Sequence, residues 1–118
     1  MKMRKLIAVV LTMVLALSLT VATSALADDA FNVALVIGVG GLGDGSFNDS
    51  LKAGCDAAVE SYGITYDIIE PVGVSEFEGD FTSLCEDGSY NLIVCGGFDA
   101  VDAVTTVAAA YPNQKFLF

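Results

Sequence analysis

Residues 38–48 have the sequence Gly38-Val39-Gly40-Gly41-Leu42-Gly43-Asp44-Gly45-Ser46-Phe47-Asn48. This glycine-rich stretch follows an apolar run, Val33-Ala34-Leu35-Val36-Ile37, which is typical of a buried strand. It precedes a segment with helical spacing. A glycine-rich turn from a strand into a helix lets backbone amides approach a ligand, and ligands of parallel α/β sheets bind at such turns. The stretch therefore predicts a parallel α/β sheet that holds a small molecule.

The remaining elements favour the same fold class. Apolar residues recur on one face of three segments, and a glycine or proline follows each, so we expect helices at 48–62, 77–87 and 99–111. Apolar runs predict strands at 33–37, 64–70, 91–95 and 115–118. Strands that alternate with helices form parallel sheets through right-handed crossovers. The prediction is a Rossmann-like α/β sheet.

The first 27 residues have the pattern of a secretory signal peptide. Lys2, Arg4 and Lys5 precede an apolar segment at 6–17, and Ala25-Leu26-Ala27 provides a small-x-small cleavage site. The alternative is an uncleaved membrane anchor, because residues 6–27 carry no charge. The short apolar core favours cleavage, and hence export to the periplasm or the cell surface. No cysteine lies near the cleavage site, so we expect no lipid anchor there.

Residues 28–118 form the predicted folded part. They contain two lysines and all fifteen acidic residues, which gives a net charge of −13 and argues against binding to nucleic acid. The last predicted strand begins only four residues before the chain stops, and 91 residues are few for such a sheet. We therefore expect an incomplete N-terminal α/β lobe of a longer protein.

The composition offers little catalytic chemistry. The chain has no histidine for a Ser/His or Cys/His pair, and the Walker A pattern is absent, so we expect no enzyme, no cofactor and no metal. Cys55, Cys85 and Cys95 match no zinc or redox spacing. They are expected to be small buried residues on two helices and a strand, although an oxidising compartment also permits one disulfide.

One enzymatic alternative comes from the glycines. The pattern Gly38-x-Gly40-x-x-Gly43, with Glu70 at the end of the second strand, matches the dinucleotide-binding fingerprint. In that motif the third glycine lies inside the helix, whereas here four residues, 44–47, intervene before the helical spacing begins. A dinucleotide-binding domain is therefore the less favoured reading.

Several residues beside the loop are candidate ligand contacts. Phe47 offers a flat face to a base or sugar, or else packs the loop onto the helix. Asn48 both donates and accepts, which suits a nucleobase edge, or else it caps the helix. Phe98 is expected at the same sheet end, in the cleft or in the core. For Asp44 and Asp49, capping and ligand contact stay equally open.

These residues resemble the basic membrane protein (PnrA-like) family of ABC-transporter substrate-binding proteins, several of which bind nucleosides. The resemblance covers 33–118, and its most specific part is Gly40-Gly41-x-x-Asp44-x-Ser46-Phe47-Asn48. It implies a type I periplasmic-binding-protein fold, in which two lobes close around the ligand. It also implies that Phe47 stacks on the base, that Asn48 contacts its polar edge, and that Gly97-Phe98 lines the cleft.

The chain departs from the family pattern at three places. The family usually has Thr-Asp where this chain has Ile37-Gly38, so a carboxylate that would face the ligand is missing. It often has an acid and a lysine at Gly43 and Gly45, and many members carry a lipid-bearing cysteine near the cleavage site.

The sequence thus predicts an exported substrate-binding protein of an ABC importer, with a permease and an ATPase as partners. It would bind a nucleoside-like molecule without chemistry. A surface sensor or adhesion module on the same fold is the alternative. The expected ligand-binding residues are Gly40, Gly41, Asp44, Ser46, Phe47, Asn48, Gly97 and Phe98.

Overall fold

The computed structural model describes residues 30–118, so the predicted signal peptide lies outside the described residues. Four strands alternate with three helices: β1 (Asn32–Val36), α2 (Phe47–Tyr62), β2 (Thr65–Ile69), α3 (Phe77–Asp87), β3 (Leu92–Cys95), α4 (Val101–Ala110) and β4 (Phe116–Leu117). Short 3-10 turns, η1 (Val74–Glu76) and η2 (Phe98–Ala100), lead into α3 and α4. Among residues 30–118, no helix is long and apolar enough to cross a membrane.

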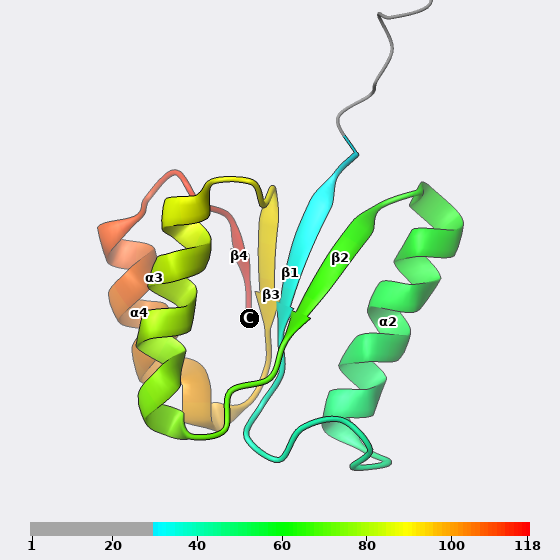
Figure 1. Cartoon of the computed structure of the whole chain (residues 1–118), viewed down its shortest axis with the longest axis horizontal. Coiled ribbons are helices and arrows are strands. Elements are labelled where there is room, and N and C mark those ends of the chain that lie inside the picture. The colour runs from blue at the N-terminus through cyan, green and yellow to red at the C-terminus, as the bar shows by residue number, and fades with distance from the viewer. Residues whose placement is uncertain (1–29) are drawn as a thin grey trace, which may run out of the picture.

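The sheet is parallel throughout and has the strand order β2-β1-β3-β4. Figure 1 shows α2 alone on one face, and α3 with α4 on the other. The chain moves from β1 outward to β2, and later from β3 outward to β4. The point where the strand order reverses therefore lies between β1 and β3, which pair directly. In open α/β sheets, ligands bind at this switch point, beyond the carboxyl ends of the strands.

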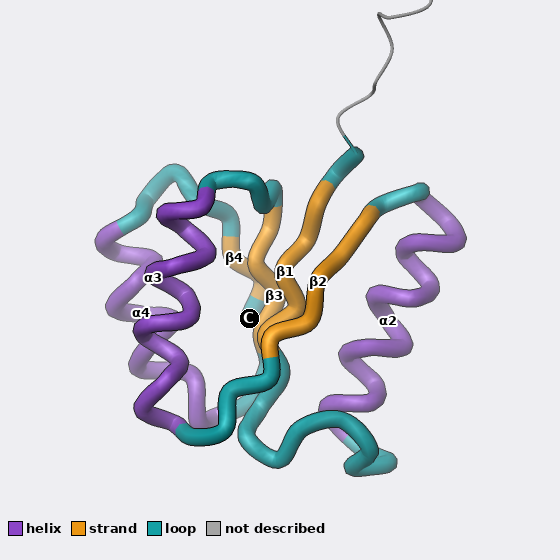
Figure 2. Tube along the Cα trace, in the orientation of Figure 1, coloured by secondary structure: helices purple, strands orange, loops and turns teal. Residues whose placement is uncertain are grey.

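The alternation of side chains along β1 divides the core into two layers. Ala34 and Val36 point into the larger cluster, which α3 and α4 cover, whereas Leu35 and Ile37 point toward α2. All four side chains are fully buried, because a central parallel strand is covered on both faces. The α/β prediction is confirmed, and Figure 2 shows the layers along the chain trace.

The predicted elements are all present, with ends that differ by one or two residues. The helix at 77–87 has its predicted bounds, and Gly63 and Gly88 end α2 and α3 in the left-handed conformation that favours glycine. The helix predicted at 99–111 is shorter, because the amide of Ala100 donates to the carbonyl of Gly97 and closes a 3-10 turn before α4 begins.

The apolar face predicted for the first helix is only partly buried. Cys55 is buried against the sheet, but Val59 is 38% exposed, which differs from its predicted core position. Within residues 30–118, α2 is the only helix on its side of the sheet, so no neighbouring helix covers Val59. An apolar groove of about 360 Å³ remains beside α2, over β1, β3 and β4.

Candidate functional site

The two glycine turns meet at the switch point. The loop 37–46 follows β1, and Gly96-Gly97 follows β3, so both lie at the carboxyl edge of paired strands. An apolar hollow of about 260 Å³ opens there, and three of its four lining residues are aromatic: Phe47, Gly97, Phe98 and Phe118. The structure therefore brings together Phe47, Gly97 and Phe98, as the sequence predicted, and adds Phe118 at the end of the fourth strand.

Phe47 forms a wall of this hollow. It is the first residue of α2 and is 53% exposed, so one part of its ring is available to a ligand. Two carbons of the ring lie 2.9 Å from the position that a Cβ on Gly96 would occupy. The ring thus packs against the bare backbone of Gly96. Phe98 is fully exposed, so the alternative that it packs in the core is wrong.

Asp44 caps α2. Its Oδ1 accepts hydrogen bonds from the amides of Ser46 and Asp49, at 2.8 and 3.2 Å, and its Oδ2 accepts one from the amide of Asn48, at 2.9 Å. Ser46 occupies the N-cap position but makes no capping bond with its side chain. The bonds from the amides of Asn48 and Ser46 lower the pKa of Asp44 below 3.8. The sequence signal for this role is an aspartate two residues before the cap, as in an Asx-turn.

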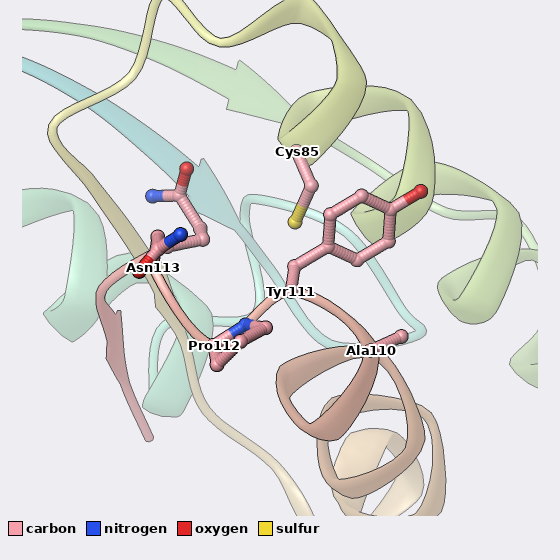
Figure 3. Close-up of a pocket in the computed structure, with 6 residues that line it drawn as sticks. Cys85, Ala110, Tyr111, Pro112 and Asn113 are labelled. Atoms are coloured by element: carbon pink, nitrogen blue, oxygen red, sulfur yellow. The ribbon is translucent and has the colours of Figure 1, made fainter.

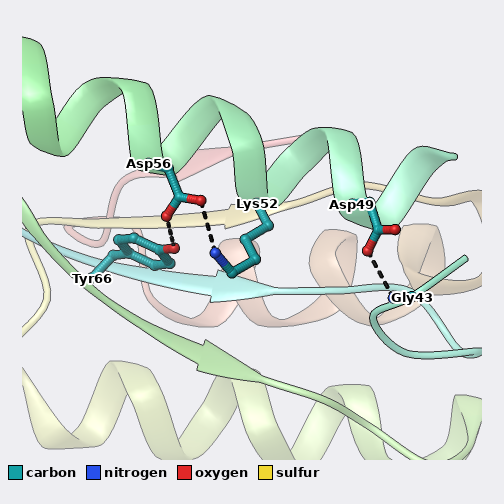
Figure 4. Close-up of polar contacts among 5 residues, drawn as sticks. All are labelled: Gly43, Asp49, Lys52, Asp56 and Tyr66. Carbon is teal, nitrogen blue, oxygen red and sulfur yellow. Dashed lines mark hydrogen bonds and ion pairs between the residues drawn. The ribbon is translucent and has the colours of Figure 1, made fainter. Parts of the chain in front are cut away.

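Other carboxylates occupy the remaining loop amides. Asp49 accepts from the amides of Gly43 and Gly45, at 2.7 and 2.8 Å, and Figure 4 shows the first of these bonds. Glu70 accepts from the amide of Leu42 at 3.3 Å. Both aspartates thus have the capping and loop-bonding role, which was one of the two alternatives. The chain's own carboxylates thus accept from most of the loop amides that were expected to bind the ligand, and contact between this loop and a ligand stays a prediction.

Asn48 is buried within the loop. Its Oδ1 accepts from the amide of Gly38 at 2.9 Å, and its Nδ2 donates to the carbonyls of Gly38 and Gly41, at 3.2 and 2.9 Å. The side chain is only 5% exposed, so its amide faces the loop backbone. Asn48 therefore fixes the path of Gly38 to Gly41. The alternative that it caps the helix is wrong, because Ser46 holds the N-cap position, and its contact with a ligand edge stays a prediction.

The same geometry does not suit a pyrophosphate. In the dinucleotide motif the phosphates lie against free amides at the helix N-terminus. Here the first amides of α2 donate to the carboxylate of Asp44, and Gly43 lies outside the helix. Glu70 does reach the loop, but it bonds to the amide of Leu42. The dinucleotide alternative is therefore wrong, because a negative group already occupies the phosphate position.

The pKa of Asp44 leads to a prediction about pH. A carboxyl group whose pKa is lowered by folding stabilises the fold above its unfolded pKa, and this contribution is lost as the pH falls through the lower folded value. We therefore expect Asp44→Asn to lower the melting temperature at pH 7, with a smaller difference from the unsubstituted chain at pH 2.5. Circular dichroism melts at both pH values measure this. An equal difference at both would contradict the capping role of the charge.

Two further features lie away from the hollow. Lys52 forms an ion pair with Asp56 at 2.7 Å, and Asp56 also accepts a hydrogen bond from the hydroxyl of Tyr66 (Figure 4). Both charged side chains are exposed, so the pair adds little stability. A second hollow lies at the opposite, amino-terminal edge of the sheet, between Cys85 and the turn at Tyr111-Pro112 (Figure 3).

The cysteines have the predicted structural role. Cys55 and Cys95 are buried in opposite core layers, Cys85 is half-buried on α3, and all three are free. Burial, together with the nearby charge of Asp99, raises the pKa of Cys95 to about 12, which keeps the thiol protonated and unreactive. Among residues 30–118, no group of histidine, cysteine and acidic side chains has an arrangement that would hold a metal ion.

A switch-point hollow on a parallel α/β sheet is the architecture of a binding lobe, and comparison with known proteins identifies the class. Residues 31–118 match the model of the family described as ABC transporter substrate-binding protein PnrA-like. The chain belongs to this family, as its sequence pattern predicted.

The relatives agree with this assignment. An uncharacterized lipoprotein of Pyrococcus abyssi is 33% identical over 84 residues, which cover 71% of this chain and 21% of that protein. The crystal structure of an ABC transporter solute-binding protein from Aeropyrum pernix is 35% identical, with a TM-score of 0.70, over 73% of this chain and 23% of that chain. A solute-binding protein from Conexibacter woesei shares the fold, with 23% identity and a TM-score of 0.63, over 74% and 28%.

These matches cover most of this chain but only a small part of each relative. The chain spans about a fifth of the length of the curated relatives it matches, and 23% of the Aeropyrum protein. The likeness therefore establishes the family and the fold of this part.

Proposed function

We propose that this chain contributes the first lobe of an exported solute-binding protein, which delivers a nucleoside-like ligand to an ABC importer and performs no chemistry. The supporting observation is the exposed face of Phe47 in an apolar hollow at the switch point. Aromatic rings stack on bases without needing a particular base, and stacking is worth about 1–3 kcal/mol per base. The expected partners are the permease and ATPase of the importer.

Two roles are proposed for the residues of the site. Phe47, Gly97 and Phe98 contact the ligand, because they line the hollow. Asp44, Ser46 and Asn48, with the turn at Gly40 and Gly41, hold Phe47 in place, because their polar groups are bonded within the loop and at the start of α2. In this proposal the ligand meets the edge of the loop, while the loop's own carboxylates keep it ordered.

A second lobe is part of the proposal. The hollow at the switch point is open to solvent, and its aromatic residues would cover only one side of a bound ring. The apolar groove beside α2 is also uncovered within residues 30–118. One wall excludes water from only one face of a ring. In the proposed protein, a second lobe closes over the hollow by a hinge motion and covers the other face. The lipoprotein relatives support a location outside the cell, at the outer face of the plasma membrane and next to the importer.

Isothermal titration calorimetry tests this proposal. The full-length two-lobe protein is titrated with inosine, guanosine and adenosine, and the 118-residue chain is titrated in parallel. We expect micromolar or tighter binding of at least one nucleoside by the two-lobe protein. The 118-residue chain is expected to bind at least about 100-fold more weakly, because it lacks the second wall. Absence of heat with every nucleoside would reject a nucleoside-like ligand, and equal binding by both proteins would reject the need for a second lobe.

A further inference from the structure

One carboxylate lies directly at the switch point. Asp99 is in η2, immediately after the glycine turn that ends β3, and its Oδ2 accepts a hydrogen bond from the amide of Val39 at 3.0 Å. Val39 belongs to the loop after β1. The side chain of Asp99 thus connects the carboxyl ends of the two central strands, which is where ligands of this architecture bind.

Two glycines make room for this carboxylate. A Cβ on Gly97 would lie 2.5 Å from Oδ1 of Asp99, and a Cβ on Gly38 would lie 3.7 Å from both carboxylate oxygens. Gly97 also has a φ of 122°, which other residues rarely adopt. The carboxylate therefore fits between two bare stretches of backbone. Oδ1 thus lies against Gly97, and Gly97 is one of the residues that line the apolar hollow.

The two oxygens of Asp99 differ in their use. Oδ2 is bonded to the amide of Val39, whereas Oδ1 accepts no hydrogen bond from any of residues 30–118. Asp99 is half-buried, and none of the described buried side-chain oxygens is without a partner, so Oδ1 keeps access to solvent. Asp44 and Asp49 differ from it, because both carboxylate oxygens of each accept bonds from backbone amides. Glu70 also bonds through one oxygen only, but it accepts from the amide of Leu42 and does not contact Gly97.

We propose that Asp99 determines specificity at this site: its Oδ1 accepts a hydrogen bond from a hydroxyl or amino group of a ligand whose ring lies against Phe47. This inference rests on the proposed function and narrows its ligand class. The favoured ligand has an aromatic ring and a hydroxyl or amine donor, as an unphosphorylated nucleoside has. Phosphorylated ligands are rejected, because a phosphate would approach Asp99 together with the carboxylates that bond to the loop.

Asp99→Asn separates ligand recognition from loop order. The amide oxygen of the new side chain can still accept from the amide of Val39, which leaves an NH₂ group toward the ligand donor. We expect a loss of about tenfold to a hundredfold in the affinity of the two-lobe protein for its best nucleoside, because a charged acceptor becomes a donor. The exchange rate of the Val39 amide proton is expected to stay unchanged.

Asp102→Asn is the matched control. It removes the same charge from the neighbouring α4 at an exposed position, and its affinity is expected to stay within about twofold of the unsubstituted protein. Equal losses in both variants would show a general charge effect and overturn the proposal. Unchanged affinity in Asp99→Asn would also overturn it, while leaving the proposed function intact. Absence of nucleoside binding by the unsubstituted protein would reject the proposed function itself.

The ligand side gives a second comparison. The unsubstituted protein is titrated with the nucleoside, its 5′-monophosphate and its 2′,3′-dideoxy form. We expect the monophosphate to bind at least about tenfold more weakly than the nucleoside. We also expect Asp99→Asn to cause a smaller loss of affinity for a form of the ligand that lacks the hydroxyl or amino group that donates to Asp99. Equal affinity for the nucleoside and its monophosphate would overturn the inferred selectivity.

Discussion

Phe81→Ala is expected to lower the free energy of unfolding by about 3–5 kcal/mol, the largest effect of any single substitution considered for this chain. Phe81 lies on α3 and is fully buried in the larger core cluster. Its ring stacks on Phe77, with centroids 6.0 Å apart, and meets Phe116 edge-on at 6.1 Å. Removing the ring leaves a cavity in the core between α3, α4 and the edge strand β4.

Urea unfolding followed by circular dichroism measures this loss. Phe98→Ala is the matched control, because it removes the same ring from a fully exposed position, and its effect is expected to stay within about 0.5 kcal/mol. If Phe81→Ala does not fold, Phe81→Leu provides a measurable intermediate loss. Similar unfolding midpoints for the Phe81 variants and the control would contradict the position of Phe81 in the core.

Phe47→Ala is expected to weaken nucleoside binding by the two-lobe protein by about tenfold to a hundredfold, with little change in stability. The ring is 53% exposed and faces the hollow, so most of its contribution belongs to the bound state. The backbone amides that Asp44 caps are unaffected by the substitution. Calorimetric titration gives the affinity, and a thermal melt gives the stability.

Tyr62→Ala is the control for Phe47. It removes an aromatic ring from the other end of the same helix, where Tyr62 is 82% exposed and lies far from the hollow along α2. Its affinity is expected to match the unsubstituted protein. Phe47→Leu separates stacking from apolar contact, since leucine keeps much of the apolar surface but has no aromatic face. An unchanged affinity in Phe47→Ala would remove Phe47 from the binding site.

Much of the fold was predictable from local patterns. The apolar run before Gly38 and the Leu-Ile-Val run at 92–94 indicated buried strands, and both became the central strands β1 and β3. The stop signals at Gly63 and Gly88 also placed the helix ends correctly. These features depend on period and on backbone freedom, which a short window of sequence contains.

The candidate site was predictable only in part. Phe47 and Phe98 were expected at one sheet end, because carboxyl ends of parallel strands share an edge, and the structure places both at the hollow. The bonding of the loop was not predictable. Glu70 and Asp99 lie 28 and 60 residues from the amides they accept from, and no local pattern relates them. Asn48 was likewise expected to face a ligand, and it is buried within the loop instead.

The carboxylates around the loop also change how the glycines are interpreted. A glycine-rich turn by itself suggests free amides for an anion. In this chain Asp44, Asp49, Glu70 and Asp99 bring negative charge to those amides, so the turn disfavours anionic ligands. The same four side chains order a loop in which Gly40, Gly41, Gly43 and Gly45 all adopt positive φ.

Apolar periodicity, glycine stops and the loop motif determined by themselves that this chain forms a parallel α/β sheet of the substrate-binding family, because each is a local property of the residues involved. Only the tertiary structure decided which loop groups remain available to a ligand. The reason is that hydrogen-bond partners such as Asp99 and Val39 come from different strand ends, and they meet only once β1 and β3 have paired.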